Sequence, residues 1–336
     1  MPPLPELIEA LLDPKIYLDH PRRVELVQTQ MSFVFLADDC VYKVKKPVNL
    51  GYLDYTTLDK RQFYCQREVE LNQRLCPDAY LGVVPIIRHE GHFSIEGQGE
   101  AIEYAVKMRR LPQEAMMDVL LADNKVSPTM LTGVAEKLAE FHQKAETNAS
   151  ISAFGDLDTI IVNTEENFTQ TEKYIGSTIS REKYQHIKAY TNRFIKEKAA
   201  LFHQRIAGGR IRDCHGDLHA AHICFCNGIC IYDCIEFNDR FRYCDVASEV
   251  AFLAMDLDHY GRADLSNHFV NAYVARSQDK ELGVLLNFYK CYRAYVRGKV
   301  ESFKLDDPHI SNEEKAQILA IARNYFELAE SYIRSE

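Results

Sequence analysis

The sequence has no long apolar run, and this absence argues against a membrane protein. A transmembrane helix needs roughly 18 consecutive apolar residues, and no stretch of the 336 residues approaches that length. Residues 1–14 also lack a basic start followed by an apolar run, which is the pattern of a signal peptide. We therefore expect a cytoplasmic protein with no membrane partner.

Basic residues are in short supply as well. The 40 Lys and Arg residues face 49 Asp and Glu residues, and the formal net charge is −9 at pH 7. Binding to nucleic acid needs Lys and Arg to displace counterions from the phosphates. We therefore expect no nucleic-acid partner, although a local basic pocket is compatible with this balance.

Cysteine is present ten times, but the chain is long and has no export pattern, so we predict no disulfide framework. Four of the cysteines lie close together at Cys224, Cys226, Cys230 and Cys234. Such spacing is also found in zinc sites. We favour buried thiols on strands instead, because a free cysteine behaves as a small hydrophobic residue.

The sequence pattern of residues 1–110 predicts a small, β-rich part of the chain. Val, Ile and aromatic residues favour strands, and the predicted strands are 24–27, 33–36, 40–44, 83–87 and 101–108. Residues 57–75 keep helical spacing. The last strand follows a glycine-rich turn at 97–99.

The sequence pattern of residues 111–336 predicts a mostly helical part, which follows a short connection near 109–112. Ser127-Pro128 is a good helix start. Further helices are predicted at 163–176, 180–206, 243–258, 264–277, 279–303 and 312–334. The last of them opens with a capping-box pattern at 311–314. There is no internal repeat, so we expect two domains, 1–110 and 111–336.

One segment interrupts the helical part: Asp-Cys-His-Gly-Asp-Leu-His at 213–219, followed by a hairpin pattern. Asn227-Gly228 is a strong signal for a two-residue turn. That turn would place Cys224 opposite Ile231 and His222 opposite Asp233, with Cβ atoms about 5 Å apart. Asp217 lies on the loop that leads to the same end, which predicts a metal and acid–base site.

This segment resembles the catalytic segment of aminoglycoside phosphotransferases and related kinases, including choline-kinase-like members. The resemblance implies an α+β, two-lobed protein-kinase-like fold with a small β-rich N-lobe and a larger, mainly helical C-lobe. It implies that Asp217 is the catalytic base, accompanied by His215. The metal ligands it implies are Asp233, His222 (where the family usually has Asn) and Glu236.

The first part of the chain resembles the same family. Lys43 matches the strand lysine that contacts ATP phosphates, and Glu68 matches its helical partner, although Lys45 shares the strand face of Lys43. The resemblance implies that Thr29 and Ser32 cover the phosphates and that Met108 lies where adenine docks. Residues 41–85 and 214–256 also look like an uncharacterised bacterial branch in which this domain is sometimes fused to a P-loop ATPase. No G-x-x-x-x-G-K-[ST] motif occurs here, so we expect any such partner to be encoded separately.

The resemblance implies an enzyme that moves the γ-phosphate of ATP to a hydroxyl group of an unidentified small-molecule acceptor, with Mg²⁺ as the cofactor. The imidazole of His222 suits Mn²⁺ better than Mg²⁺. Arg293 and Arg297 lie on the helix predicted at 279–303, either as a basic surface for an acidic acceptor or as a solvated face.

Two alternatives stay open. A metal-dependent hydrolase could use the ligand types present at His215, Asp217, His219 and His222. A nucleotide-binding pseudokinase would explain why His222 stands where the family has Asn.

Overall fold

The computed structural model describes residues 5–334. These divide into two compact units, one made of Met1–Val119 with His222–Asp239 and the other of Leu120–Ala221 with Arg240–Glu336. The sequence led us to expect a single boundary near residue 110. The structure instead places the first boundary after Val119 and returns a later segment of the chain to the first unit.

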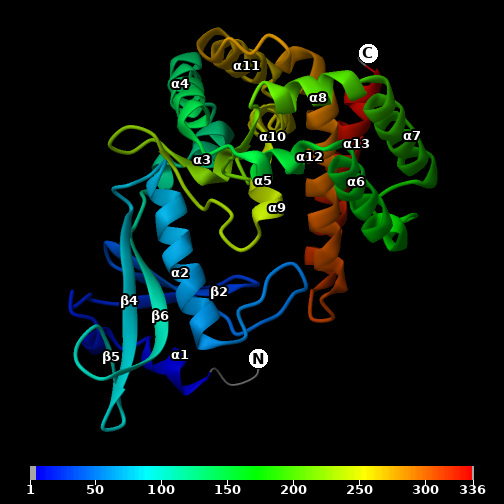
Figure 1. The fold of residues 1–336 in the computed structure, drawn as a ribbon. Coiled ribbons are helices and arrows are strands. Elements are labelled where there is room, and N and C mark those ends of the chain that lie inside the picture. Colours follow the sequence, from blue (N-terminus) through cyan, green and yellow to red (C-terminus); the bar gives the residue numbers. More distant parts are fainter. Residues whose placement is uncertain (1–4, 335–336) are drawn as a thin grey trace. The chain divides into compact units, whose positions relative to one another are not determined.

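The first unit contains a six-stranded antiparallel sheet with the order β1-β2-β3-β6-β4-β5. Its strands are β1 Val24–Gln28, β2 Ser32–Ala37, β3 Cys40–Lys45, β4 Tyr80–His89, β5 His92–Ile95 and β6 Glu100–Arg109. Five of these strands contain the predicted ranges, and β5 was not predicted. Figure 1 shows β4 and β6 side by side with the helix α2, Leu58–Gln73, packed along them.

Side chains on the two faces of this sheet enter two different cores, because successive residues of a strand point in opposite directions. On β6, Ala105 packs with Phe35 and Tyr42 and with the short N-terminal helix α1, Glu6–Ala10. The next residue, Val106, packs on the other face with Cys65 and Val69 of α2. The second core fixes α2 against the sheet.

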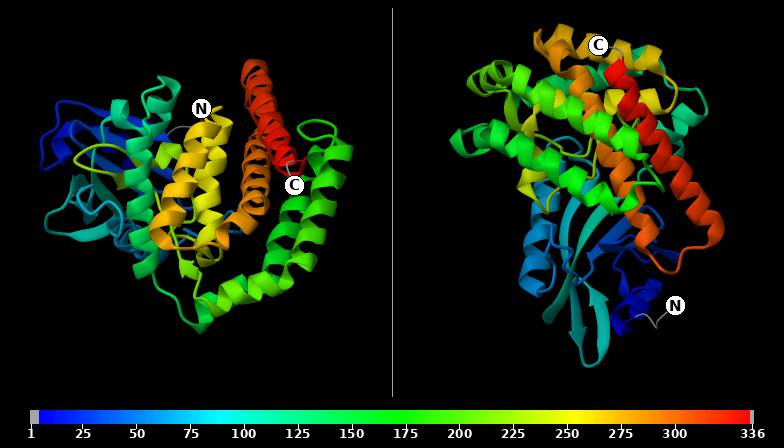
Figure 2. Two further views of the ribbon diagram at one scale, coloured as in Figure 1. Left: turned by 90° about the horizontal axis from the view of Figure 1, so that it is seen from above. Right: turned by 90° about the vertical axis from the view of Figure 1, so that its right-hand side faces the viewer.

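The second unit is built from helices. Its longer ones are α4 Pro128–Lys144, α6 Leu157–Thr171, α7 Arg181–Glu197, α8 Ala199–Ala207, α10 Val246–His259, α11 Ala263–Ser277, α12 Leu282–Phe303 and α13 Asn312–Arg334. Helix α12 packs against both α10 and α13, and α11 packs against α4 (Figures 1 and 2). No helix among residues 5–334 is long and apolar enough to span a membrane.

Three helix predictions need correction at their ends. The range 180–206 is two helices, because Lys198 adopts a non-helical backbone between α7 and α8. The range 243–258 starts later, because Tyr243–Asp245 forms the strand β10 and pairs with β7, Ile211–Asp213. Helix α6 starts at Leu157, six residues before the predicted start at 163.

The predicted register of the late hairpin is wrong by one residue. Its strands are only β8 Ile223–Cys224 and β9 Cys230–Ile231, and Cys224 pairs with Cys230 instead of Ile231. The reason is a third segment: Cys224 also bridges to Met116, and the Phe225 N–H donates to the Ala115 carbonyl at 2.9 Å. These contacts take Phe225 out of the hairpin and lengthen its loop beyond the two-residue turn.

The interpretation of Cys230 as a free thiol is also wrong. Cys230 forms a disulfide with Cys76, 154 residues earlier and within the same unit. The other three cysteines of the stretch, Cys224, Cys226 and Cys234, are free thiols, as expected.

Candidate functional site

Two lysines of β3 share one buried glutamate of α2 in the first unit. Lys43 and Lys45 lie two residues apart and therefore point to the same face of the strand. The Lys43 Nζ lies 2.9 Å from Oε1 of Glu68, and the Lys45 Nζ lies 2.6 Å from its Oε2. Glu68 is completely buried. The structure thus brings Lys43 and Glu68 together, as predicted, and adds a second lysine.

Burial and charge act in opposite directions on this cluster. Burial alone would raise the pKa of Glu68, but the two ammonium groups lower it below the ordinary value. Burial alone would lower the pKa values of both lysines, but the carboxylates around them raise those values well above the ordinary range. Each pair therefore stabilises the ionised form of its partners.

Asp233 lies beside Lys43 and has an unusual backbone. Its Oδ1 lies 2.9 Å from the Lys43 Nζ, and its side chain is 42% exposed. Its φ of 63° is in the left-handed region, which is uncommon for residues other than glycine. The backbone is held by hydrogen bonds: the Asp233 N–H donates to the Tyr80 hydroxyl, and the Cys234 N–H donates to Oδ1 of Asn72. A strained residue that is held in this way is a common feature of functional sites.

The helix α2 explains how the sequence builds this geometry. Thr57 caps the helix by accepting a hydrogen bond from the Lys60 N–H. Glu68 and Asn72 are four residues apart and so lie on one face of the helix. Glu68 binds the lysines of β3 while Asn72 binds the backbone next to Asp233. One turn of helix therefore positions both parts of the cluster.

His222 and Asp233 are neighbours, as predicted. The Nε2 of His222 lies 3.5 Å from Oδ2 of Asp233. The pairing of β8 with β9 differs from the predicted register. His222 is therefore not directly opposite Asp233, and its side chain spans the remaining distance to the Asp233 carboxylate.

Glu236 is almost completely buried, and its carboxylate already has two partners. It is 8% exposed, and its Oε1 accepts hydrogen bonds from the Lys45 Nζ and from the Tyr55 hydroxyl. Its role as a metal ligand stays a prediction, and the geometry makes it a counter-ion of Lys45.

The remaining residues predicted in the first unit occupy structural positions. Thr29 accepts hydrogen bonds from the N–H groups of Met31 and Ser32 in the loop between β1 and β2. Ser32 is 2% exposed, and Met108 lies in the core beneath α2. Their contacts with a nucleotide stay predictions.

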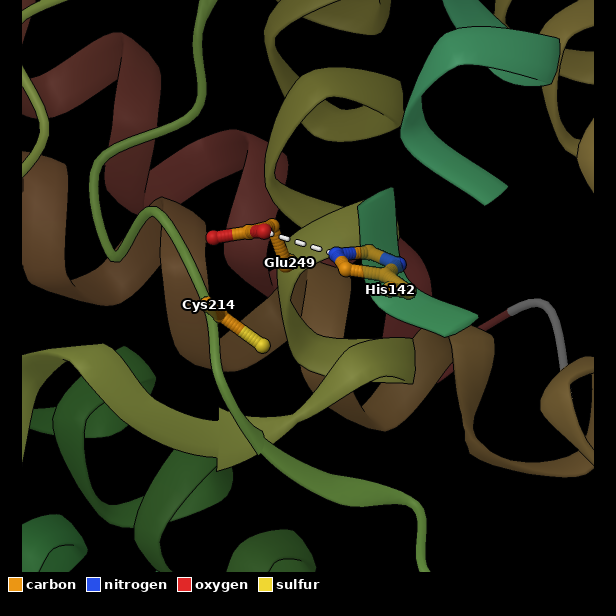
Figure 3. A group of neighbouring side chains, drawn as sticks. All are labelled: His142, Cys214 and Glu249. Carbon is orange, nitrogen blue, oxygen red and sulfur yellow. Dashed lines mark hydrogen bonds and ion pairs between the residues drawn. The ribbon is translucent and has the colours of Figure 1, made fainter. Parts of the chain in front are cut away.

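The second unit contains the loop His215-Gly216-Asp217, which is held by a buried glutamate. The N–H groups of His215 and Gly216 both donate to Oε1 of Glu249 at 2.7 Å. The other oxygen of Glu249 lies 2.8 Å from Nε2 of His142, on α4 (Figure 3). Because Glu249 is on α10, these bonds tie the loop to two helices. We call Glu249 and His142 the loop clamp.

Electrostatics keeps Glu249, the carboxylate of the loop clamp, ionised. Burial would raise the pKa of Glu249, but His142, His215 and the Gly216 N–H together lower it to about 2. Cys214 lies close to both residues (Figure 3), and burial raises the pKa of its thiol well above the ordinary value. Both ring nitrogens of His142 already have partners, Glu249 and the Tyr273 hydroxyl. This cluster therefore serves as a hydrogen-bonded support for the loop.

Asp217 lies at the partly exposed end of the loop. Its side chain is 33% exposed, and its Oδ2 lies 3.6 Å from Nε2 of His219. Burial would lower the pKa of His219, and the Asp217 carboxylate raises it above its ordinary value. The Asp217 N–H donates to Nδ1 of His215, which is fully buried. That bond occupies one of the two ring nitrogens of His215.

The two arginines predicted as a basic surface differ in their surroundings. Arg293 is 7% exposed and donates to the Gly216 carbonyl at 3.2 Å and to the Ser248 hydroxyl at 3.1 Å. It therefore braces the loop from α12. Burial would lower the pKa of Arg297, but Tyr325 and Asp217 raise it above the ordinary value. Arg297 thus interacts electrostatically with Asp217.

No family model matches this chain. Uncharacterized proteins of Mycobacterium tuberculosis and Mycobacterium bovis are 35% identical over 279 residues, which cover 83% of this chain and 54% of each relative. The chain thus spans about half the length of the curated relatives it matches.

A choline/ethanolamine kinase family protein from Mesorhizobium loti has a similar structure, with a TM-score of 0.50 and 11% identity over 93% of this chain and 92% of that chain. The chain has a choline-kinase-like fold. The predicted α+β, two-lobed kinase-like fold class is confirmed. The ADP-bound aminoglycoside phosphotransferase APH(2'')-Ib superposes with a TM-score of 0.49 and 17% identity, over 97% of this chain and 99% of that chain.

Sequence reasoning missed several residues of the candidate site and its surroundings. The sequence offered a clue to Lys45, since this residue shares a strand face with Lys43. It offered no clue to Glu249 and His142, because their partners are backbone N–H groups and residues more than 30 positions away in the chain. Tyr55, which binds Glu236 at 2.6 Å, lies outside any regular pattern.

Proposed function

We propose that this chain is a kinase-like phosphotransferase that moves the γ-phosphate of ATP to a hydroxyl group of a small molecule. The observation that carries the proposal is the array in which buried Glu68 holds Lys43 beside the partly exposed carboxylate of Asp233. Phosphoryl transfer needs positioned charges more than covalent chemistry. The choline-kinase-like fold supports this reading.

The first unit would hold the nucleotide. Lys43 supplies a compact positive charge for phosphate oxygens. The array also contains the carboxylates of Glu68, Asp233 and Glu236 against two lysines, so it has a net negative charge. A polyphosphate needs a bridging cation in such surroundings.

The residues present fit a divalent cation. Asp233 offers a carboxylate that is 42% exposed, on a backbone fixed at positive φ. Oxygen ligands suit Mg²⁺, and the nearby His222 imidazole makes Mn²⁺ a good alternative. When bound, the cation would neutralise charge on the phosphates.

The second unit would act on the acceptor. The hydroxyl oxygen of the acceptor forms a bond to the γ-phosphorus while the bond from that phosphorus to the β–γ bridging oxygen breaks, and ADP leaves. The hydroxyl proton passes to the Asp217 carboxylate, a general-base role. Glu249 and Arg293 act as positioning residues, because they hold the backbone of the loop. The acceptor is unidentified, since one fold hosts many acceptors, and the P-loop ATPase partner stays a prediction.

Calorimetric ATP binding with Mg²⁺ and with Mn²⁺ tests the nucleotide half of the proposal. We expect ATP binding that requires the metal. In Asp233→Ala this binding should become at least about tenfold weaker, since an interaction with a charged group contributes roughly 1.5–3 kcal/mol. Asp59→Ala changes an exposed carboxylate of α2 outside the array and should bind as the wild type does. If neither metal supports ATP binding, the phosphotransferase reading fails. Stoichiometric zinc in the dialysed protein would then favour the hydrolase.

A pseudokinase is the second candidate, and His222 is the observation that favours it. Its Nε2 lies 3.5 Å from Oδ2 of Asp233, where a metal would approach. In that case the wild type binds ATP without transferring phosphate, and His222→Asn creates activity. Wild-type transfer to any of a panel of amino alcohols and aminoglycosides, lost in Asp217→Asn, would decide for the enzyme.

A further inference from the structure

A cavity of about 270 Å³ opens in the second unit, next to the loop clamp. Its floor includes the buried residues His142 and Tyr273, and its exposed rim includes Glu140 and Arg276. Arg210 and Arg212 complete the wall. The proposed function uses none of the three arginines.

The cavity has an excess of positive charge. Three guanidinium groups line it, against the single carboxylate of Glu140. That carboxylate is paired with Arg276, whose Nη2 lies 2.9 Å from its Oε1 and which lowers its pKa. Arg210 is only loosely paired, with its Nε 3.9 Å from Oδ2 of Asp279.

Arg212 is the least compensated of the three. Its Nε donates to the Gly209 carbonyl at 3.0 Å, and its Nη1 donates to the Ala145 carbonyl at 2.7 Å. These partners are neutral, and no carboxylate in the described part of the chain pairs with Arg212. The carbonyls hold the guanidinium in place without neutralising it, so its remaining N–H groups stay suited to an anion.

We propose that this cavity binds a small anion with a phosphate or carboxylate group and that the bound anion stabilises the loop His215-Gly216-Asp217. Guanidinium forks match the oxygens of both groups. The Tyr273 hydroxyl on the floor lies 2.7 Å from Nδ1 of His142, and His142 binds Glu249, which holds the loop. An anion here therefore contacts the first member of a continuous hydrogen-bonded chain that ends at the N–H groups of His215 and Gly216. Binding to this cavity does not depend on the proposed function.

Calorimetric titration with inorganic phosphate and with citrate, at constant ionic strength, tests the site and separates the two anion classes. We expect saturable binding of at least one of them that weakens about tenfold in Arg276→Gln, because hydrogen bonds to charged groups contribute roughly 1.5–3 kcal/mol. Glu140→Gln removes the only carboxylate of the lining and should tighten binding, an outcome that a misfolded variant cannot produce. The matched control is Arg262→Gln. Arg262 directly precedes α11, the helix that carries Arg276, and it is paired with Asp264 outside the cavity.

Phosphate could also bind at the lysines of the first unit, and Lys43→Met separates the two sites. Retained phosphate binding in Lys43→Met supports the cavity. Loss in that variant with no effect of Arg276→Gln would overturn the proposal, as would the absence of saturable binding of either anion. The link to the loop is read by hydrogen exchange of a peptide covering 213–217. Slower exchange with the anion supports the link, and unchanged exchange overturns it.

Discussion

Single carboxylates serve several partners at once in this protein. Glu68 pairs with two lysines, and Glu249 binds two backbone N–H groups and one imidazole. Both residues are fully buried. A buried carboxylate whose oxygens are shared in this way is costly to replace, because each partner would be left without its bond.

Glu249→Gln tests this cost through pH. The pKa of Glu249 is lowered from 4.5 to about 2 in the folded protein. Its ionised form therefore stabilises the fold fully above about pH 4.5, and the contribution is lost as the pH falls from 4.5 to 2. We expect the variant to lose about 3 kcal/mol of unfolding free energy at pH 7, at 1.36 kcal/mol per pKa unit. Urea unfolding of the variant should also depend less on pH between 4.5 and 2.

Glu313→Gln, an exposed residue of α13, provides the comparison for that experiment. It should change stability by less than about 0.5 kcal/mol. A Glu249→Gln variant with the same acid sensitivity as the wild type would show that Glu249 is not the group responsible.

The sequence predicted some of these residue contacts and not others. Lys43 and Glu68 could be paired because the strand and the helix were both recognised and the family resemblance linked them. The sequence could not rank Lys43 against Lys45, since both point to one face and differ mainly in burial: the Lys45 side chain is 1% exposed and that of Lys43 is 19% exposed. Burial of this kind depends on tertiary packing, which no local pattern encodes.

At the scale of elements, a capping signal predicted the start of α13 correctly, whereas a turn signal predicted the wrong register for the late hairpin. The capping box at the start of α13 forms as predicted, with the Glu314 N–H donating to the Ser311 hydroxyl and the Ser311 N–H donating to Glu314 Oε2. The Asn227-Gly228 signal gave a hairpin but the wrong register. That register depends on Met116, more than 100 residues away in sequence, and a two-residue turn signal contains no information about such a partner.

Ser311→Ala tests the capping box. Loss of the hydroxyl leaves a helix N–H without its acceptor and should lower the unfolding free energy by about 1 kcal/mol. Thermal or urea unfolding measures the change. The matched variant is Ser331→Ala, which removes an exposed hydroxyl near the other end of α13 that donates to the Leu328 carbonyl. If both variants are equally stable, the cap contributes nothing to α13.

At the scale of the whole molecule, the first unit is assembled from two distant parts of the chain. The disulfide between Cys76 and Cys230 joins these parts across the entire segment 120–221, which belongs to the second unit. A cross-link between residues far apart in sequence stabilises mainly by restricting the unfolded chain.

Reduction of this disulfide should therefore lower the unfolding free energy of the first unit by about 3 kcal/mol. Denaturant unfolding with and without dithiothreitol measures the effect, and Cys230→Ser should match the reduced wild type. Alkylation in denaturant should label eight of the ten cysteines before reduction, since eight are free. Ten labelled cysteines without reductant would contradict the bond.

The split of the first unit also sets an order of events during translation. The ribosome delivers β3 and α2 early, with Glu68 and its two lysines, but Asp233 and Glu236 arrive only after all of residues 120–221 have been made. The sheet of the nascent chain therefore lacks the carboxylates of Asp233 and Glu236 while residues 120–221 of the other unit are synthesised. A chain that stalls before residue 239 cannot complete its first unit, however well its first 119 residues fold.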